Sequence, residues 1–190
     1  MQSIVEILAQ ELGQKQQYIE NVVNLIDEGN TIPFIARYRK EMHGAMDDTT
    51  LRNLETRLTY LRNLQQRRDE VKKSIENQGK LTEELSAAID NASTMTEVED
   101  LYRPYKQKRR TRGSIAREKG LDPLAQAIFA QDGQNIEKLA QGFLDAEKGV
   151  ATVEEAIAGA SDIIAENLSD DAEIRKNLRA LVMRRGSLVS

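Results

Sequence analysis

The chain has 190 residues and a net charge of −4 at pH 7, with 39% of its residues hydrophobic and only 4% aromatic. It contains no Cys, which excludes disulfides and cysteine-ligated metals. No apolar run approaches the roughly 20 residues that a membrane-spanning helix needs, and the acid Glu6 stands where a secretory signal would carry basic and then apolar residues. We therefore expect a cytoplasmic protein without a membrane partner.

The spacing of apolar residues predicts an all-α fold, a multi-helix array joined by short turns. Leu, Ile, Val and Ala recur at helical spacing, and no stretch alternates with period two. Most glycines fall where an apolar repeat stops, and the three prolines fall near helix starts or breaks. Ser3 with Glu6, Thr96 with Glu99 and Thr152 with Glu155 have the spacing of capping boxes, which predicts three helix starts.

A short helix is expected at about residues 32–39, because Thr31 precedes an Ile-Pro-Phe sequence with proline in the first turn. We expect Phe34, Ile35 and Tyr38 to face a core. Three cations follow closely, namely Arg37, Arg39 and Lys40. Arginines set among so many apolar residues favour buried or domain-bridging ion pairs, with phosphate contact as the alternative.

The longest helix is predicted near residues 49–78 and carries one apolar stripe. The stripe consists of Leu51, Leu54, Leu58, Leu61, Leu64, Val71 and Ile75. Asp47 and Asp48 precede its first turn, which favours helix capping over a pair of catalytic or Mg²⁺-binding carboxylates.

Residues 102–119, called the basic segment below, carry eight Lys or Arg and one acid, Glu118. The local charge of +7 contrasts with the acidic remainder of the chain, so a polyanion would be attracted here first. Pro104 is expected to end the preceding helix and to hold Arg103 extended. These features predict an N-terminal helical half (1–102), a basic loop (103–113) and a C-terminal helical half (114–190).

Ser114 is expected to cap the first helix of the C-terminal half. The small residues of 156–161 predict that another helix crosses there closely, and acids at the start with Arg184 and Arg185 at the end suit the dipole of a last helix.

The candidate nucleic-acid contacts are cations of the basic loop: Arg103, Lys106, Lys108, Arg109, Arg110 and Arg112. Each can neutralise a phosphate, and Tyr102 and Tyr105 can stack on bases. No pattern specifies a base, so binding is expected to be independent of sequence. Two alternatives stay open: the tyrosines belong to a core and the cations pair with acids of this protein or of other domains, or the loop is merely solvated.

Catalysis finds little support in the residues. His43 is the only histidine, and we expect it to be a solvent-exposed turn residue rather than a metal ligand or member of a triad. Phosphate-binding, nucleophile-elbow and dinucleotide-binding glycine motifs are absent from the sequence. We expect no enzyme activity and no cofactor.

Three segments in order carry a family resemblance: residues 27–41, residues 100–112 with 115–121, and residues 158–166. Over essentially its whole length the chain resembles the N-terminal region of the bacterial Tex family of transcription accessory proteins. The resemblance implies a longer parent protein with RNase H-like, helix-hairpin-helix and S1 domains, which are missing here and are expected partners. It also implies a cytoplasmic, nucleic-acid-binding protein connected with the transcription machinery.

The same resemblance implies a helix-turn-helix-like unit, for which 3–39 and 114–143 are the two candidate stretches. We therefore expect a nucleic-acid-associated, sequence-independent helical module of a Tex-like protein. The alternative is an interaction or interdomain scaffold module that does not contact nucleic acid directly.

Overall fold

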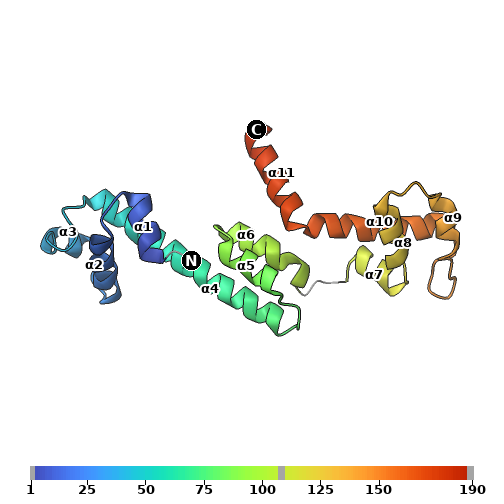
Figure 1. The fold of residues 1–190 in the computed structure, drawn as a ribbon, viewed down its shortest axis with the longest axis horizontal. Helices are drawn as coiled ribbons and strands as arrows, with labels where there is room; N and C mark the ends of the chain where they lie inside the picture. The colour runs from blue at the N-terminus through green and yellow to red at the C-terminus, as the bar shows by residue number, and fades with distance from the viewer. Residues whose placement is uncertain (1–2, 107–109, 188–190) are drawn as a thin grey trace. The chain divides into compact units, whose positions relative to one another are not determined.

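The computed structural model describes residues 3–106 and 110–187, and these residues are helical apart from turns and one isolated bridge between Asp145 and Val150. The all-α prediction is confirmed (Figure 1). The chain forms two compact units that divide between Ser74 and Ile75. The sequence-based division at residues 103–113 stays a prediction.

The first unit is built from three short helices and most of one long helix. These are α1 (Ile4–Leu12), α2 (Gln16–Asp27), α3 (Ile32–Tyr38) and α4 (Asp48–Glu76). Each contributes apolar side chains to one core, including Leu8 of α1, Ile19 of α2, Ile35 of α3 and Leu54 of α4, all with no exposed surface. Amphipathic helices of this length are stable because that shared face is buried.

The starts of α1 and α4 follow the sequence signals. Ser3 and Glu6 form the predicted capping box of α1. The Asp47 carboxylate accepts a hydrogen bond from the Thr50 backbone N–H at 2.7 Å, so it caps α4. Asp48 instead pairs with Arg52 one turn later, at 2.7 Å.

The prediction for α3 was wrong for two of its three apolar residues. Ile35 is buried, as is Ile32, but Phe34 is 36% exposed and Tyr38 56% exposed. The helix is only two turns long, and positions three apart share its inner face, which is filled by the two isoleucines. The two aromatic rings are left on the outer face.

The prediction that His43 is exposed was also wrong, because its side chain is 1% exposed. The turn that contains it packs onto α2. Asn21 of α2 donates its side-chain N–H to the Met42 carbonyl oxygen at 3.0 Å, and a Cβ on Gly44 would lie 2.4 Å from the Tyr18 ring. Neither ring nitrogen of His43 has a hydrogen-bond partner among the described residues.

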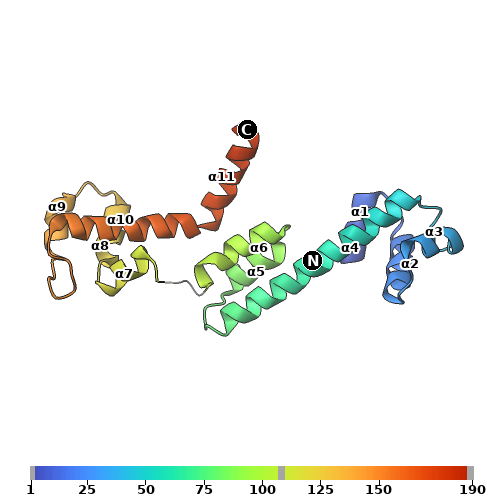
Figure 2. The same cartoon turned by 180° about the vertical axis from the view of Figure 1, so that it is seen from behind.

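The second unit contains seven helices and one 3₁₀ turn within the described residues. They are α5 (Glu83–Asn91), α6 (Met95–Tyr102), η1 (Arg103–Tyr105), α7 (Arg112–Glu118), α8 (Asp122–Ala130), α9 (Ile136–Gln141), α10 (Val153–Asp170) and α11 (Ala172–Arg185). Helix α10 lies against α7, α8 and α9, as Figure 2 shows from behind. Its buried residues Ala156, Ala160 and Ile163 join Leu121 and Leu124 in a second core.

The predicted close crossing at residues 156–161 is present. A Cβ on Gly159 would lie 2.4 Å from a methyl group of Leu121 and 3.3 Å from Ala116. Small side chains on α10 therefore allow α7 and the start of α8 to approach its backbone closely.

Around the basic segment the structure is more regular than a loop. Residues 103–105 form a 3₁₀ turn, and Arg103 has helical dihedral angles (φ −51°, ψ −43°) despite preceding Pro104. Thr94, not Thr96, caps α6, and Thr111, not Ser114, caps α7. Ser114 takes part as the reciprocal partner in the capping box of Thr111.

Candidate nucleic-acid interface

Two of the predicted phosphate ligands, Arg103 and Lys106, are paired with carboxylates of the second unit. The Arg103 Nε donates to Asp170, at the end of α10, at 2.9 Å. Lys106 bonds to Glu99 of α6 and lies 5.4 Å from the centre of the Tyr102 ring. Both cations therefore attach the start of the basic segment to its own unit.

Arg110 and Arg112 are held much more loosely. Arg110 pairs with Glu118 at 2.9 Å, but its side chain is 70% exposed. The Arg112 side chain is 87% exposed, and its Nε lies 3.7 Å from Asp162, beyond hydrogen-bonding distance. Lys108 and Arg109, the other two predicted ligands, lie outside the described residues.

Glu166 of α10 anchors the helix that follows the loop. Its carboxylate accepts a hydrogen bond from the Thr111 hydroxyl at 2.9 Å and another from Arg117. A Cβ on Gly113 would lie 2.7 Å from this carboxylate, so glycine allows the first turn of α7 to reach α10. The position of Arg112 is thus set by a fixed helix start rather than by a free loop.

A cleft of about 800 Å³ lies beside these residues, between the basic segment and the end of α10. Lys106, Arg110 and Arg117 line it together with Glu118 and Glu166. Asp170 and Asp171 add two further acids. A phosphate chain inside the cleft would meet these carboxylates, so the cations most available to a polyanion are the two most exposed ones, Arg110 and Arg112.

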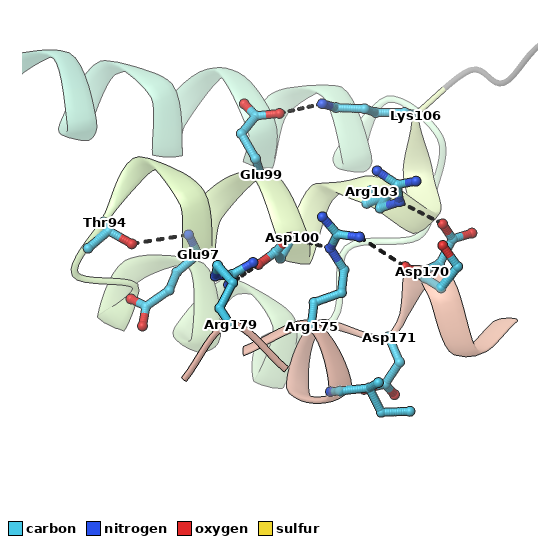
Figure 3. A network of polar contacts seen from close by, with 12 residues as sticks. Thr94, Glu97, Glu99, Asp100, Arg103, Lys106, Asp170, Asp171, Arg175 and Arg179 are labelled. Carbon is cyan, nitrogen blue, oxygen red and sulfur yellow. Dashed lines mark hydrogen bonds and ion pairs between the residues drawn. The ribbon is translucent and has the colours of Figure 1, made fainter. Parts of the chain in front are cut away.

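A further polar cluster of the second unit lies between α6 and α11 and centres on Asp100 (Figure 3). The Asp100 side chain is 5% exposed. It accepts a hydrogen bond from Arg175 at 2.6 Å on one oxygen and from Arg179 on the other. Lys176 adds a looser pair with Glu97 at 3.6 Å.

The pKa of Asp100 lies below its ordinary value. Burial raises it, but the hydrogen bonds from Arg179 and Arg175 and their positive charges lower it by more. The carboxylate is therefore ionised in the folded protein at neutral pH, and α11 is attached to α6 by charge rather than by a buried apolar face.

Comparison with known proteins identifies the chain. Residues 2–76 match the family profile of the Tex-like protein N-terminal domain, and residues 131–190 match that of the Tex central region-like family. The chain is 48% identical over 177 residues to the transcriptional accessory protein Tex of Neisseria gonorrhoeae, covering 93% of this chain and 23% of that protein. The chain belongs to the Tex family.

Two further relatives extend the family comparison. Protein YhgF of Escherichia coli is 48% identical over 188 residues, which cover 99% of this chain and 24% of that protein. The S1 RNA-binding domain-containing protein 1 of Homo sapiens is 29% identical over 183 residues, which cover 96% of this chain and 18% of that protein. The chain thus spans about a quarter or less of the length of these relatives.

The structural role of Asp100 was not predicted from the sequence. The signal that was available is the spacing of Arg175 and Arg179, which lie one turn apart and so share a face of the last helix. Charges that are buried when a helix packs need partners. Two cations on the packing face of a helix therefore predict an acid opposite them.

No helix in the described ranges is long and apolar enough to cross a membrane. The same residues hold no group of three or more His, Asp or Glu placed to bind a metal ion.

Proposed function

We propose that this Tex-family chain is a nucleic-acid-associated helical module that contacts phosphates without reading base sequence. The observation that carries the proposal is the exposure of Arg112 and Arg110, with 87% and 70% of their side chains accessible. Both extend from a segment of local charge +7.

The ion pairs of these two arginines do not prevent phosphate binding. An exposed pair contributes only about 0–1 kcal/mol, so exchanging Glu118 or Asp162 for a phosphate costs little. Arg103 and Lys106 contribute to structure instead, because their partners lie on helices of the same unit. Contacts made only to phosphates carry no base information, which is the physical reason for sequence independence.

The names of the relatives support the same proposal. The relative from Neisseria gonorrhoeae is named a transcriptional accessory protein, and the human relative is named for an S1 RNA-binding domain. We infer a role of this module in a cytoplasmic transcription accessory protein, alongside domains that lie elsewhere in such proteins, and we infer no catalytic role for it.

Binding of fluorescently labelled oligonucleotides to the 190-residue chain tests the proposal. We expect anisotropy to report binding at low salt, with similar affinity for oligonucleotides of unrelated base sequence. The double variant Arg110→Ala/Arg112→Ala should bind several-fold more weakly. The control Lys138→Ala/Lys148→Ala removes the same charge from exposed positions of the same unit and should bind like the wild type.

Equal weakening by both double variants would show that net charge alone is sensed. A strong preference for one base sequence would contradict the sequence-independent mode.

A second candidate function is a scaffold that holds other parts of a Tex protein, and helix α11 favours it. The helix has no buried residue, and four of its apolar side chains are between 41% and 86% exposed: Leu178, Leu181, Val182 and Met183. Copurification of this chain with the remaining part of the Neisseria gonorrhoeae relative, supplied as a separate chain, tests this role. Val182→Glu should abolish copurification, and Glu147→Gln should not.

A further inference from the structure

Helix α3 in the first unit carries an exposed face that the proposed function does not use. Ile32 and Ile35 point into the core, whereas Phe34 and Tyr38 lie one turn apart on the outer side. Arg37 is exposed on the same short helix. Exposed aromatic rings side by side are unusual on a chain that has only eight Phe and Tyr in total.

Cations flank both rings. The Phe34 and Tyr38 ring centres are 5.2 Å apart, with an angle of 47° between the ring planes. The Arg39 guanidinium lies 5.3 Å from the Phe34 ring centre, and the Arg37 guanidinium lies 5.9 Å from that of Tyr38. Together with the exposed Lys40, these residues form what we call the α3 face.

The cations of the α3 face have no carboxylate partner among the described residues. Arg37, Arg39 and Lys40 take part in none of the ion pairs between described residues. The contrast with the basic segment is direct, since its four described predicted ligands each have an acid within 4 Å. Three positive charges without a partner are complementary to an anionic ligand.

The face is held in place from behind. The turn that follows α3 is tied to α2 by the hydrogen bond from Asn21 to the Met42 carbonyl oxygen. His43 is buried in that turn, and Gly44 packs against the Tyr18 ring. A ligand would therefore meet a preorganised surface, which reduces the entropy cost of binding.

We propose that the α3 face binds single-stranded nucleic acid, with unpaired bases stacked on Phe34 and Tyr38 and phosphates at Arg37, Arg39 and Lys40. Stacking on aromatic rings beside cations is the general means by which proteins hold single strands without sequence preference. A duplex offers phosphates but keeps its bases stacked inside, so it can contact the cations of the α3 face but cannot stack on its rings. The inference rests on the proposed nucleic-acid association for its ligand, but it uses a different unit from Arg110 and Arg112.

The test measures binding of the whole 190-residue chain to labelled 12-nucleotide single strands of DNA and of RNA with the same sequence. Phe34→Ala/Tyr38→Ala should weaken binding by about tenfold or more, because each base stacked on an aromatic ring contributes on that scale. Phe34→Tyr/Tyr38→Phe keeps two rings and should bind like the wild type. Phe129→Ala removes a ring of the second unit that is 60% exposed, more than either ring of the α3 face, and should also bind normally.

A duplex competitor separates stacking from charge. We expect it to displace the single strand poorly from the wild type and more readily from Phe34→Ala/Tyr38→Ala, because this variant loses base stacking but keeps its phosphate contacts. The DNA and RNA arms show which of the two single strands is preferred, and either preference is consistent with the stacking surface. Circular dichroism checks that each variant keeps the helical content of the wild type.

Three outcomes separate this inference from the proposed function. Weaker binding by Phe34→Ala/Tyr38→Ala, with a smaller effect of Arg110→Ala/Arg112→Ala, supports the α3 face. Wild-type binding that is unchanged in Phe34→Ala/Tyr38→Ala overturns the inference, leaves the proposed function standing and points to a protein partner for the rings. A wild-type chain that binds no oligonucleotide at low salt overturns both.

Discussion

The Asp100 carboxylate is the residue on which the attachment of α11 depends. It is buried, and the described part of α11 contributes no buried side chain, so the two arginines that contact it replace the apolar face that usually fixes a helix. Arg175 and Arg179 are themselves partly exposed, so removing the carboxylate costs the two charge-assisted hydrogen bonds rather than leaving buried charges behind.

We predict that Asp100→Asn destabilises the second unit by about 1.5–3 kcal/mol, because an amide cannot accept two charged hydrogen bonds as a carboxylate does. Chemical unfolding monitored by circular dichroism measures this free energy. Hydrogen exchange should also become faster in α11. Glu147→Gln, at an exposed carboxylate, serves as the control and should change stability little. Unchanged α11 protection in Asp100→Asn would contradict this role.

Because the pKa of Asp100 is lowered in the folded state, the stability that this carboxylate contributes depends on pH. The unfolded state holds a proton on Asp100 below an ordinary aspartate pKa of about 3.9, whereas the folded state does so only at lower pH. The unfolded state therefore binds more protons in that range, and stability falls as pH falls. We predict a constant difference in unfolding free energy between wild type and Asp100→Asn from pH 7 to pH 5. The difference should shrink below about pH 4, and a difference that grows there would refute the assignment.

Single residues were also the least predictable from sequence. A lone histidine in a polar turn gives no sign that the turn packs onto α2, so the burial of His43 comes only from tertiary structure. The basic residues stand out by charge, and their role as nucleic-acid contacts stays a prediction. The partners Asp170 of Arg103 and Asp162 of Arg112 lie far along the chain on α10, so these pairs depend on the packing of that helix.

At the scale of elements, most helices and their caps follow from local sequence rules. The predicted boxes at Ser3 and Thr152 are present, and the long helix predicted at 49–78 is observed as Asp48–Glu76. Short helices are harder to predict, because a two-turn helix has room for only one inner face. In α3 that face is filled by Ile32 and Ile35, so the prediction that Phe34 and Tyr38 lie in the core was wrong.

The turn after α3 offers a sharp test of element packing. Gly44 has φ +61°, and a Cβ there would lie 2.4 Å from Tyr18, whereas Gly29 has φ +87° with open space around it. Both substitutions to Ala incur the cost of a left-handed backbone, roughly 1 kcal/mol. We predict that Gly44→Ala lowers the unfolding free energy of the first unit by at least about 1 kcal/mol more than Gly29→Ala does. Equal losses would mean that Tyr18 moves aside freely.

At the scale of the whole molecule, the chain has two units with separate cores. Charge and helical periodicity predicted the all-α class, but the boundary within α4 has no sequence signal, because the apolar stripe of that helix continues across it.

Separate cores predict separate responses to cavity-forming substitutions. Leu54 and Ile163 are both fully buried, in the first and second unit respectively. Leu54→Ala and Ile163→Ala should each cost about 2–5 kcal/mol. Residue-resolved hydrogen exchange should show the loss of protection mainly in the unit that carries the substitution. Equal loss in both units after either change would indicate that the chain unfolds as one cooperative body.

The salt dependence of single-strand binding tests the central claim, nucleic-acid association through phosphates, most directly. Each engaged cation contributes a slope of about −0.7 to a plot of log affinity against log salt concentration for a single strand. We predict measurable binding at low salt, a clearly negative slope for the wild type, and a slope about 1.4 smaller in magnitude for Arg110→Ala/Arg112→Ala. Absence of binding at the lowest salt, or a slope near zero, would contradict the claim.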